Sequence, residues 1–208
     1  MQQICSEGVV VNVVNYGDHD QVLTVFTRDH GVVKLIAKGN RRQHRRSSDR
    51  SAEVSPMTRG EFLYVQGNGE LMRCGQIHVL DRYLSLRKTL AHLSAAGDCI
   101  NVIRLSQLPG TPAPELYRLL LYYLERLPEM EDPQVLSCSY YLKVLKYEGV
   151  LSFQRYAFLS FSQQEQEQLQ ILTHSRSFAD LVSMKLDEVL RSKVKKLFGL
   201  LLEKTLSV

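Results

Sequence analysis

The stretch "EGVVVNVVNYGDHDQVLTVFTRDHGVVKLIAKG", residues 7–39, holds three apolar, β-branched runs separated by two turn-forming clusters. The runs are residues 8–16, 21–27 and 32–39, and the clusters are "YGDHD" and "RDHG". Runs of this length and composition, bounded by Gly and Asp, are typical of strands joined by short turns. The stretch therefore predicts a meander of three strands.

Two further strands are predicted downstream, in "EFLYVQ" (residues 61–66) and "ELMRCGQIHVL" (residues 70–80). Gly67-Asn68-Gly69 joins them, and Asn-Gly between such runs is a strong hairpin signal because both residues tolerate positive φ. Five short strands in about 80 residues predict a small closed barrel, of which the OB-fold is the five-stranded example.

The chain changes character near residue 80, where leucine and isoleucine begin to recur at helical spacing. Helices are predicted to start at Thr111 to Pro114, at Asp132-Pro133 and at Ser162-x-x-Glu165, and the second of these is predicted to stop at Gly149. A last helix is predicted over residues 187–206. The predicted fold class is therefore α+β with two domains. Residues 1–80 form an OB-fold five-stranded β-barrel, and residues 81–208 form an all-helical bundle.

The composition is that of an ordinary soluble globular protein, with 208 residues, 44% hydrophobic and 23% charged. No stretch approaches the roughly 20 apolar residues that span a bilayer, and "MQQICSEG" lacks the pattern of a signal peptide. A cytoplasmic location is expected. The four cysteines are far apart without a C-x-x-C pair, which favours reduced, buried thiols over disulfides or a zinc site.

The positive charge is concentrated in residues 38–50, which have a net charge of +5. The candidate DNA-binding residues are Lys34 on the third predicted strand and Lys38, Arg41, Arg42, Arg45, Arg46 and Arg50 after it. In an OB-fold, nucleic acid lies across the central strands and is flanked by loops. Arginines there would neutralise phosphates without reading the base sequence. The alternatives are a solvated loop with incidental charge and a nuclear-localisation signal.

A second basic cluster lies on the polar side of the last predicted helix. Its members, the candidate partner-binding residues, are Arg191, Lys193, Lys195 and Lys196. Most such clusters are only a solvated helix face. The functional alternatives are an additional DNA contact and the capture of an acidic peptide tail beside an apolar pocket.

Base stacking would require an exposed aromatic side chain, for which Tyr16 and Tyr64 are candidates, although packing is the commoner role of tyrosine in a small barrel. Asp18, His19 and Asp20 suggest a metal centre, but a hairpin turn capped by aspartate explains them better. The sequence contains no phosphate-binding glycine loop and no recognisable nucleophile–base pair. An enzyme, such as a metal-dependent nuclease using Asp18 and Asp20, is therefore the least favoured hypothesis.

A set of residues in the first 39 positions occurs in a specific order and spacing: Glu7-Gly8, Tyr16-Gly17, Asp20, Phe26-Thr27, Gly31 and Ala37-Lys38-Gly39 followed by arginines. This pattern resembles the opening of the RecO family of bacterial recombination mediators. The likeness continues weakly through "SPMT", Glu61 and "GNGEL". Beyond these residues it extends only to the order of elements.

The resemblance implies an N-terminal OB-fold, a helical C-terminal domain and a function without catalysis. Proteins of this family bind single- and double-stranded DNA, anneal complementary strands and pair with a partner called RecR. They engage the acidic C-terminal tail of the single-stranded-DNA-binding protein and help a recombinase replace that protein on DNA. The resemblance thus implies a nucleoid-associated protein of the bacterial cytoplasm, with no membrane partner, small-molecule substrate or cofactor.

One departure from the family pattern concerns zinc. Many relatives carry two C-x-x-C pairs that hold the metal, whereas residues 150–177 here contain no cysteine. We therefore expect no metal in this chain. The alternative function, from another class, is a protein-interaction adaptor whose barrel and bundle bind only proteins.

Overall fold

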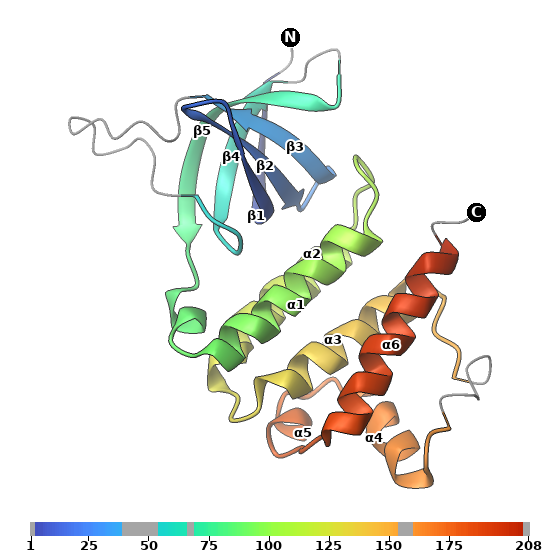
Figure 1. The fold of residues 1–208 in the computed structure, drawn as a ribbon. Helices are drawn as coiled ribbons and strands as arrows, with labels where there is room; N and C mark the ends of the chain where they lie inside the picture. The colour runs from blue at the N-terminus through green and yellow to red at the C-terminus, as the bar shows by residue number, and fades with distance from the viewer. Residues whose placement is uncertain (1–2, 39–53, 66–68, 154–159, 206–208) are drawn as a thin grey trace. The chain divides into compact units, whose positions relative to one another are not determined.

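The computed structural model describes residues 3–38, 54–65, 69–153 and 160–205. Five strands come first along the chain and helices follow (Figure 1). Internal contacts divide the chain into two compact units. The first comprises Met1–Leu84 with Ser106–Leu119, and the second comprises Ser85–Leu105 with Leu120–Val208. Each unit is described in turn.

The first unit contains a closed five-stranded barrel. Its strands are β1 (Gln3–Tyr16), β2 (Asp20–Thr27), β3 (Gly31–Ala37), β4 (Arg59–Val65) and β5 (Leu71–Asp81). They are ordered β1-β2-β3-β5-β4, and all neighbours are antiparallel except β3 and β5. The predicted OB-fold five-stranded barrel is confirmed.

Closure of the barrel depends on β1, which pairs with β4 through its first half and with β2 through its second half. The register with β2 shifts between Val10 and Asn12, and a shift of this kind bends a strand. The amide of Met57 donates to the Val10 carbonyl at 2.8 Å, and the Val10 amide donates to the Thr58 carbonyl at 2.9 Å. The segment that leads into β4 is therefore anchored beside this bend.

The barrel core follows the two-residue period of the strands. Leu23 and Val25 on β2 are buried, whereas Val22 and Thr24 beside them are only partly buried. The core consists of Val10, Leu23, Val25, Val33, Leu35, Ala37, Val54, Phe62 and Tyr64. A side chain on one face of β2 therefore lies inside the barrel, and the next side chain lies outside it.

Glycines with positive φ form two of the barrel turns. Gly17, at φ +58°, lies in the turn between β1 and β2, which confirms the predicted "YGDHD" turn. Gly31 begins β3 at φ +64°, and the Gly110 amide donates to the neighbouring Val32 carbonyl at 3.0 Å. The segment before α2 (Pro114–Arg126) is thereby attached to β3. The predicted β4–β5 hairpin is antiparallel, and residues 66–68 of its turn lie outside the described residues.

A half-buried carboxylate joins the two sequence segments of the first unit. Glu7 Oε1 accepts hydrogen bonds from Arg59 Nε at 2.6 Å and from the Tyr117 hydroxyl at 3.1 Å. Burial and the Glu7 charge raise the pKa of Tyr117 above that of an ordinary tyrosine. The Tyr117 ring packs edge-on against Phe26, with 5.7 Å between centroids.

The remaining elements are helical: η1 (Leu84–Arg87), α1 (Leu90–Ser106), η2 (Leu127–Glu129), α3 (Pro133–Tyr147), α4 (Gln163–His174), α5 (Ala179–Val182) and α6 (Glu188–Thr205). Three predicted boundaries are confirmed. Asp132 caps α3 by accepting from the Gln134 amide, Gly149 follows α3 at φ +70°, and Ser162 and Glu165 form a capping box on α4. No helix in the described ranges is long and apolar enough to cross a membrane.

Helix α3 is the centre of the second unit. Eleven of its fifteen residues are buried, and it packs against both α4 and α6. A helix buried on nearly all sides needs partners for its polar side chains. Ser139 Oγ lies 2.8 Å from the Tyr123 hydroxyl and donates to the Leu172 carbonyl at 2.6 Å. This network connects α2, α3 and the last turn of α4.

The cysteines only partly match their prediction. All four are free, and Cys99 and Cys138 are buried as expected, with burial raising the pKa of the Cys138 thiol to about 12. Cys5 is exposed on β1 and Cys74 is only partly buried on β5, which corrects the prediction that all four thiols are buried. Strand alternation explains the exposure of Cys5, since Cys5 follows Ile4, which packs toward the barrel core.

Candidate nucleic-acid interface

The strand register identifies the residues that lie on the outer face of the barrel. Val13, Leu23, Leu35 and Met72 are mutual neighbours across β1, β2, β3 and β5 and pack in the core. The adjacent register positions must then face outward. They form a row across the same four strands, which we call the outer row: Val14, Val22, Ile36 and Arg73.

The two predicted lysines lie on β3 and just beyond it. Lys34 is exposed and pairs across the sheet with Thr24, and its Nζ is 3.7 Å from Glu70 Oε2. Both partners of this ion pair are exposed, so the pair is weak and leaves Lys34 accessible to a phosphate. Lys38 is also exposed, directly after the last residue of β3. Ile36 lies between these two lysines along the strand.

The five predicted arginines, Arg41, Arg42, Arg45, Arg46 and Arg50, lie outside the described residues. Their contact with phosphates therefore stays a prediction. The described residues on either side, Lys38 and Val54, follow β3 and precede β4. The arginine-rich segment thus connects two strands of the barrel.

Sequence reasoning missed Arg73. This residue is exposed on β5, and the parallel β3–β5 register places it opposite Ile36. The only sequence signal was its position in the strand predicted over residues 70–80. A parallel pairing between strands more than 30 residues apart leaves no local signature, so the sequence could not place Arg73 beside Lys34 and Lys38.

The two candidate stacking residues have different environments. Tyr16 is 59% exposed at the end of β1, beside the β1–β2 turn. Tyr64 is 1% exposed in the barrel core, where burial raises its pKa to about 12 and its ring packs edge-on against His30. The packing interpretation is therefore confirmed for Tyr64. Tyr16 is left as the stacking candidate.

The "DHD" sequence forms part of a hairpin turn, as the favoured interpretation predicts. Asp18 and His19 are exposed in the turn, and Asp20 begins β2 opposite Tyr16. Among the described residues, no group of three His, Cys, Asp or Glu side chains could hold a metal ion. Residues 154–159, within the cysteine-free stretch of residues 150–177, are outside the described ranges.

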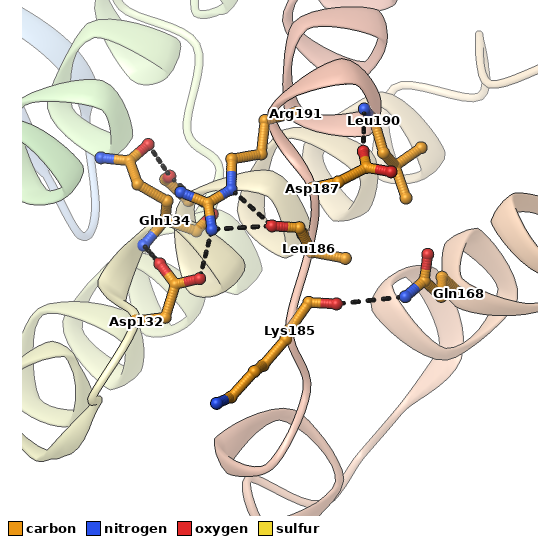
Figure 2. Close-up of polar contacts among 9 residues, drawn as sticks. Asp132, Gln134, Gln168, Lys185, Leu186, Asp187, Leu190 and Arg191 are labelled. Carbon is orange, nitrogen blue, oxygen red and sulfur yellow. Dashed lines mark hydrogen bonds and ion pairs between the residues drawn. The ribbon is translucent and has the colours of Figure 1, made fainter.

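In the second unit, Arg191 of the C-terminal basic cluster is engaged in internal contacts (Figure 2). Its guanidinium donates to the Leu186 carbonyl, from Nε at 3.1 Å and from Nη2 at 2.8 Å, and also to the Asp132 carboxylate. Asp132 accepts at the same time from the Gln134 amide at 3.3 Å. Arg191 therefore ties the start of α3 to the segment before α6.

Two of the three lysines in the cluster are also ion-paired within the unit. Lys193 Nζ is 2.7 Å from Glu165 Oε1, and Lys195 Nζ is 3.1 Å from Asp98 Oδ2. The hydrogen bond from Lys193 and that from the Ser162 amide lower the pKa of Glu165. Lys196 is exposed. Arg191, Lys193 and Lys195 therefore make contacts within the second unit. The role of the cluster in partner binding stays a prediction.

A hollow of about 610 Å³ lies beside this cluster. Its lining residues are Ser162, Gln164, Glu165, Gln168, Lys185, Leu186 and Asp187. Gln168 Nε2 donates to the Lys185 carbonyl at 3.2 Å across it (Figure 2). Leu186 is the one apolar residue among those that line the hollow.

Replacing Arg191 with methionine should lower the free energy of unfolding by about 2 kcal/mol. The substitution leaves the half-buried Asp132 carboxylate and the Leu186 carbonyl without their charged donor, and hydrogen bonds of this kind contribute about 1.5–3 kcal/mol. Chemical denaturation measures the change. Lys196→Ala is the control and should change stability by less than about 0.5 kcal/mol. Equal stability of R191M and wild type would contradict the structural role.

Comparison with known proteins gives one family model and several relatives. The model described as "Recombination protein O N terminal" matches residues 1–83. The "DNA repair protein RecO" of Chlamydia pneumoniae is 24% identical over 209 residues, which cover 88% of this chain and 81% of that protein. The proteins of the same name from Desulfitobacterium hafniense and Geobacter metallireducens are 31% and 32% identical, over 69% and 63% of this chain. The chain spans about half the length of these last two relatives.

Proposed function

We propose that the chain, whose residues 1–83 match the N-terminal model of the RecO family and which is similar to RecO proteins over most of its length, is a non-enzymatic recombination mediator of that family. It binds single- and double-stranded DNA and anneals complementary strands. With RecR, it helps to load a recombinase onto DNA coated by single-stranded-DNA-binding protein. The protein acts through charge and partner contacts, and no bond is made or broken.

The observation that supports DNA binding best is the basic rim of the barrel. Lys34, Lys38 and Arg73 are exposed around Ile36, on strands that lie at the ligand-binding face of OB-folds. The arginine-rich sequence of residues 41–50 continues directly from this rim along the chain. We assign DNA binding to residues 1–80 and partner binding to residues 81–208.

Replacing Arg41 and Arg45 together with alanine should weaken DNA binding and reduce its salt dependence. Four phosphate contacts by the basic residues predict a slope of log K against log salt of about −3 on single strands. Losing two of these contacts should make the slope shallower by about 1.4. Titration of oligothymidylate at several salt concentrations measures the slope. The weakening should be the same for all base sequences, because phosphate contacts carry no sequence information.

The control for this experiment removes two exposed basic residues from the second unit, Arg104 and Lys146. The change in net charge is the same, so an equal effect would reflect the overall field of the protein. An unchanged slope in the Arg41/Arg45 variant would exclude the segment as the binding site. Absence of any salt-dependent binding by the wild-type protein would favour the adaptor that binds only proteins.

Strand annealing tests the partner half of the proposal. The protein should accelerate annealing of complementary oligonucleotides coated with single-stranded-DNA-binding protein, without any nucleotide. The same assay with that protein's acidic tail removed should lose the acceleration. Acceleration that persists without the tail would contradict recognition of this partner by its acidic C-terminus.

A further inference from the structure

Helix α1 lacks the charged outer face of an ordinary surface helix. Its seventeen residues include one acid, Asp98, and one lysine or arginine, Arg104. The Asp98 carboxylate is engaged inside the second unit, where Lys195 Nζ lies 3.1 Å from its Oδ2. A helix that is apolar on all sides is normally covered on all sides. The composition of α1 is therefore that of a helix that packs against two neighbouring surfaces.

One side of α1 is nevertheless exposed. Its buried residues, which share the opposite side, are Ala95, Ala96, Cys99, Ile100, Val102 and Ile103. The residues that recur at spacings of three and four on the exposed side form what we call the open face: Leu90, Ser94, Gly97, Asn101 and Leu105. Leu90 is 83% exposed, more than any other large apolar side chain in the described ranges, and Leu105 is 41% exposed. A leucine at each end of one uncharged helix face distinguishes the open face from a scatter of single apolar residues.

Gly97 lies at the centre of the open face, and the fold of the second unit does not require a glycine there. A Cβ added to Gly97 would meet nothing within 4 Å among the described residues outside the helix backbone. Glycine in a helix interior is less stable than alanine, so this position carries a cost that packing within the unit does not explain. The missing side chain would instead allow a second backbone to approach α1 closely.

The charges at the two ends of the open face decide which partner fits it. Lys88, just before the helix, and Arg104, in its last turn, are both exposed. Arg104 donates from Nη2 to Asn101 Oδ1 at 2.8 Å, which holds its guanidinium beside the open face. A second copy of the chain would therefore place cation against cation in either direction of pairing. A helix with acidic residues at both of its ends would be complementary.

We propose that the open face of α1 binds an amphipathic helix of a partner protein. The apolar side of that helix packs over Gly97 between Leu90 and Leu105, and its acidic ends meet Lys88 and Arg104. Recognition of this kind reads apolar residues three and four positions apart on the bound helix. The inference rests on the proposed function, because it gives a site and a partner chemistry to the partner binding assigned to residues 81–208.

The probe is a fluorescent, stapled helical peptide of about 18 residues, long enough to match α1. It has leucine and alanine at spacings of three and four and glutamate at both ends. Fluorescence anisotropy with the full chain should show binding, and the same peptide with lysine at both ends should bind about tenfold more weakly. Equal binding of the two peptides, or no binding of either, would overturn the proposal.

Gly97→Leu blocks the open face without disturbing the fold, because its side chain enters unoccupied space and leucine favours a helix. Its unfolding midpoint should not fall, and its affinity for the glutamate peptide should fall about tenfold or more. Gln170→Leu, at an exposed position of α4, is the matched control and should not change that affinity. Undiminished binding by Gly97→Leu would overturn the proposal.

The last measurements separate this inference from its alternatives. Lys88→Glu combined with Arg104→Glu should reverse the preference, so that the lysine peptide binds more tightly than the glutamate peptide. A wild-type dimer that Gly97→Leu abolishes, seen by sedimentation, would overturn the proposal in favour of a second copy. Loss of peptide binding with oligothymidylate binding intact would overturn the open face alone. Peptide binding by a wild-type protein that ignores oligothymidylate would overturn DNA binding and leave the open face standing.

Discussion

Replacing Gly31 with alanine should lower the free energy of unfolding by about 3 kcal/mol. Gly31 has φ +64°, a conformation that costs an L-residue about 1–2 kcal/mol. A Cβ at this position would also lie 2.0 Å from the carbonyl oxygen of Thr111, and overpacking of this kind costs about 1–3 kcal/mol. Because the obstacle is backbone, a side-chain rotation cannot relieve it.

Gly17→Ala separates the two contributions. Gly17 has nearly the same φ, +58°, but a Cβ there would have no atom within 4 Å. This variant should lose only about 1 kcal/mol, the backbone cost alone. Urea unfolding of the three proteins, followed by circular dichroism, measures both values. Equal losses in the two variants would show that the contact between the added methyl group at position 31 and the Thr111 carbonyl costs no stability.

Replacing Ser139 with alanine should also destabilise the protein by about 3 kcal/mol. Ser139 is fully buried, and its hydroxyl is hydrogen-bonded to both Tyr123 and the Leu172 carbonyl. Leu172 lies in the last turn of α4, where carbonyls lack an intrahelical donor. Alanine would leave two buried polar groups unpaired, at about 1–3 kcal/mol each before any relaxation.

Tyr123→Phe is the matched control, because it removes one hydroxyl and leaves Ser139 free to donate to Leu172. It should cost about 1 kcal/mol, the net contribution of one ordinary hydrogen bond. Denaturant unfolding distinguishes the variants, with the Ser139→Ala midpoint well below that of Tyr123→Phe. A larger loss for Tyr123→Phe would mean that the tyrosine, and not the serine, holds the network together.

The predictions that succeeded concern interactions between residues close in the sequence. The β1–β2 turn needs only Gly17 and its neighbours, and the capping box of α4 needs only Ser162 and Glu165. Hydrogen bonds of this kind form over three or four residues, so their pattern is visible in the amino-acid order. The family resemblance in residues 7–39 added the identity of the barrel to these local signals.

The predictions that the sequence could not make depend on contacts between distant segments. Tyr16 and Tyr64 both fall in predicted strands, yet only Tyr16 faces solvent. Closure of the barrel decides this, because the side of a strand that becomes the interior is set by its neighbours. The basic cluster on α6 shows the same limit, since the acids that engage Arg191 and Lys193 come from the N-cap of α3 and from α4.

The amino-acid order alone thus determined the five strands, three of the helix boundaries, the RecO-like opening and the concentration of positive charge before β4. Only the tertiary structure decided which side chains share a surface, including Arg73 beside Lys34 and Tyr16 beside Val14, Val22 and Ile36. The physical reason is the range of the interactions. Turns and caps are made by neighbours in the chain, whereas a surface across β1, β2, β3 and β5 exists only once strand register and barrel closure have brought remote residues together.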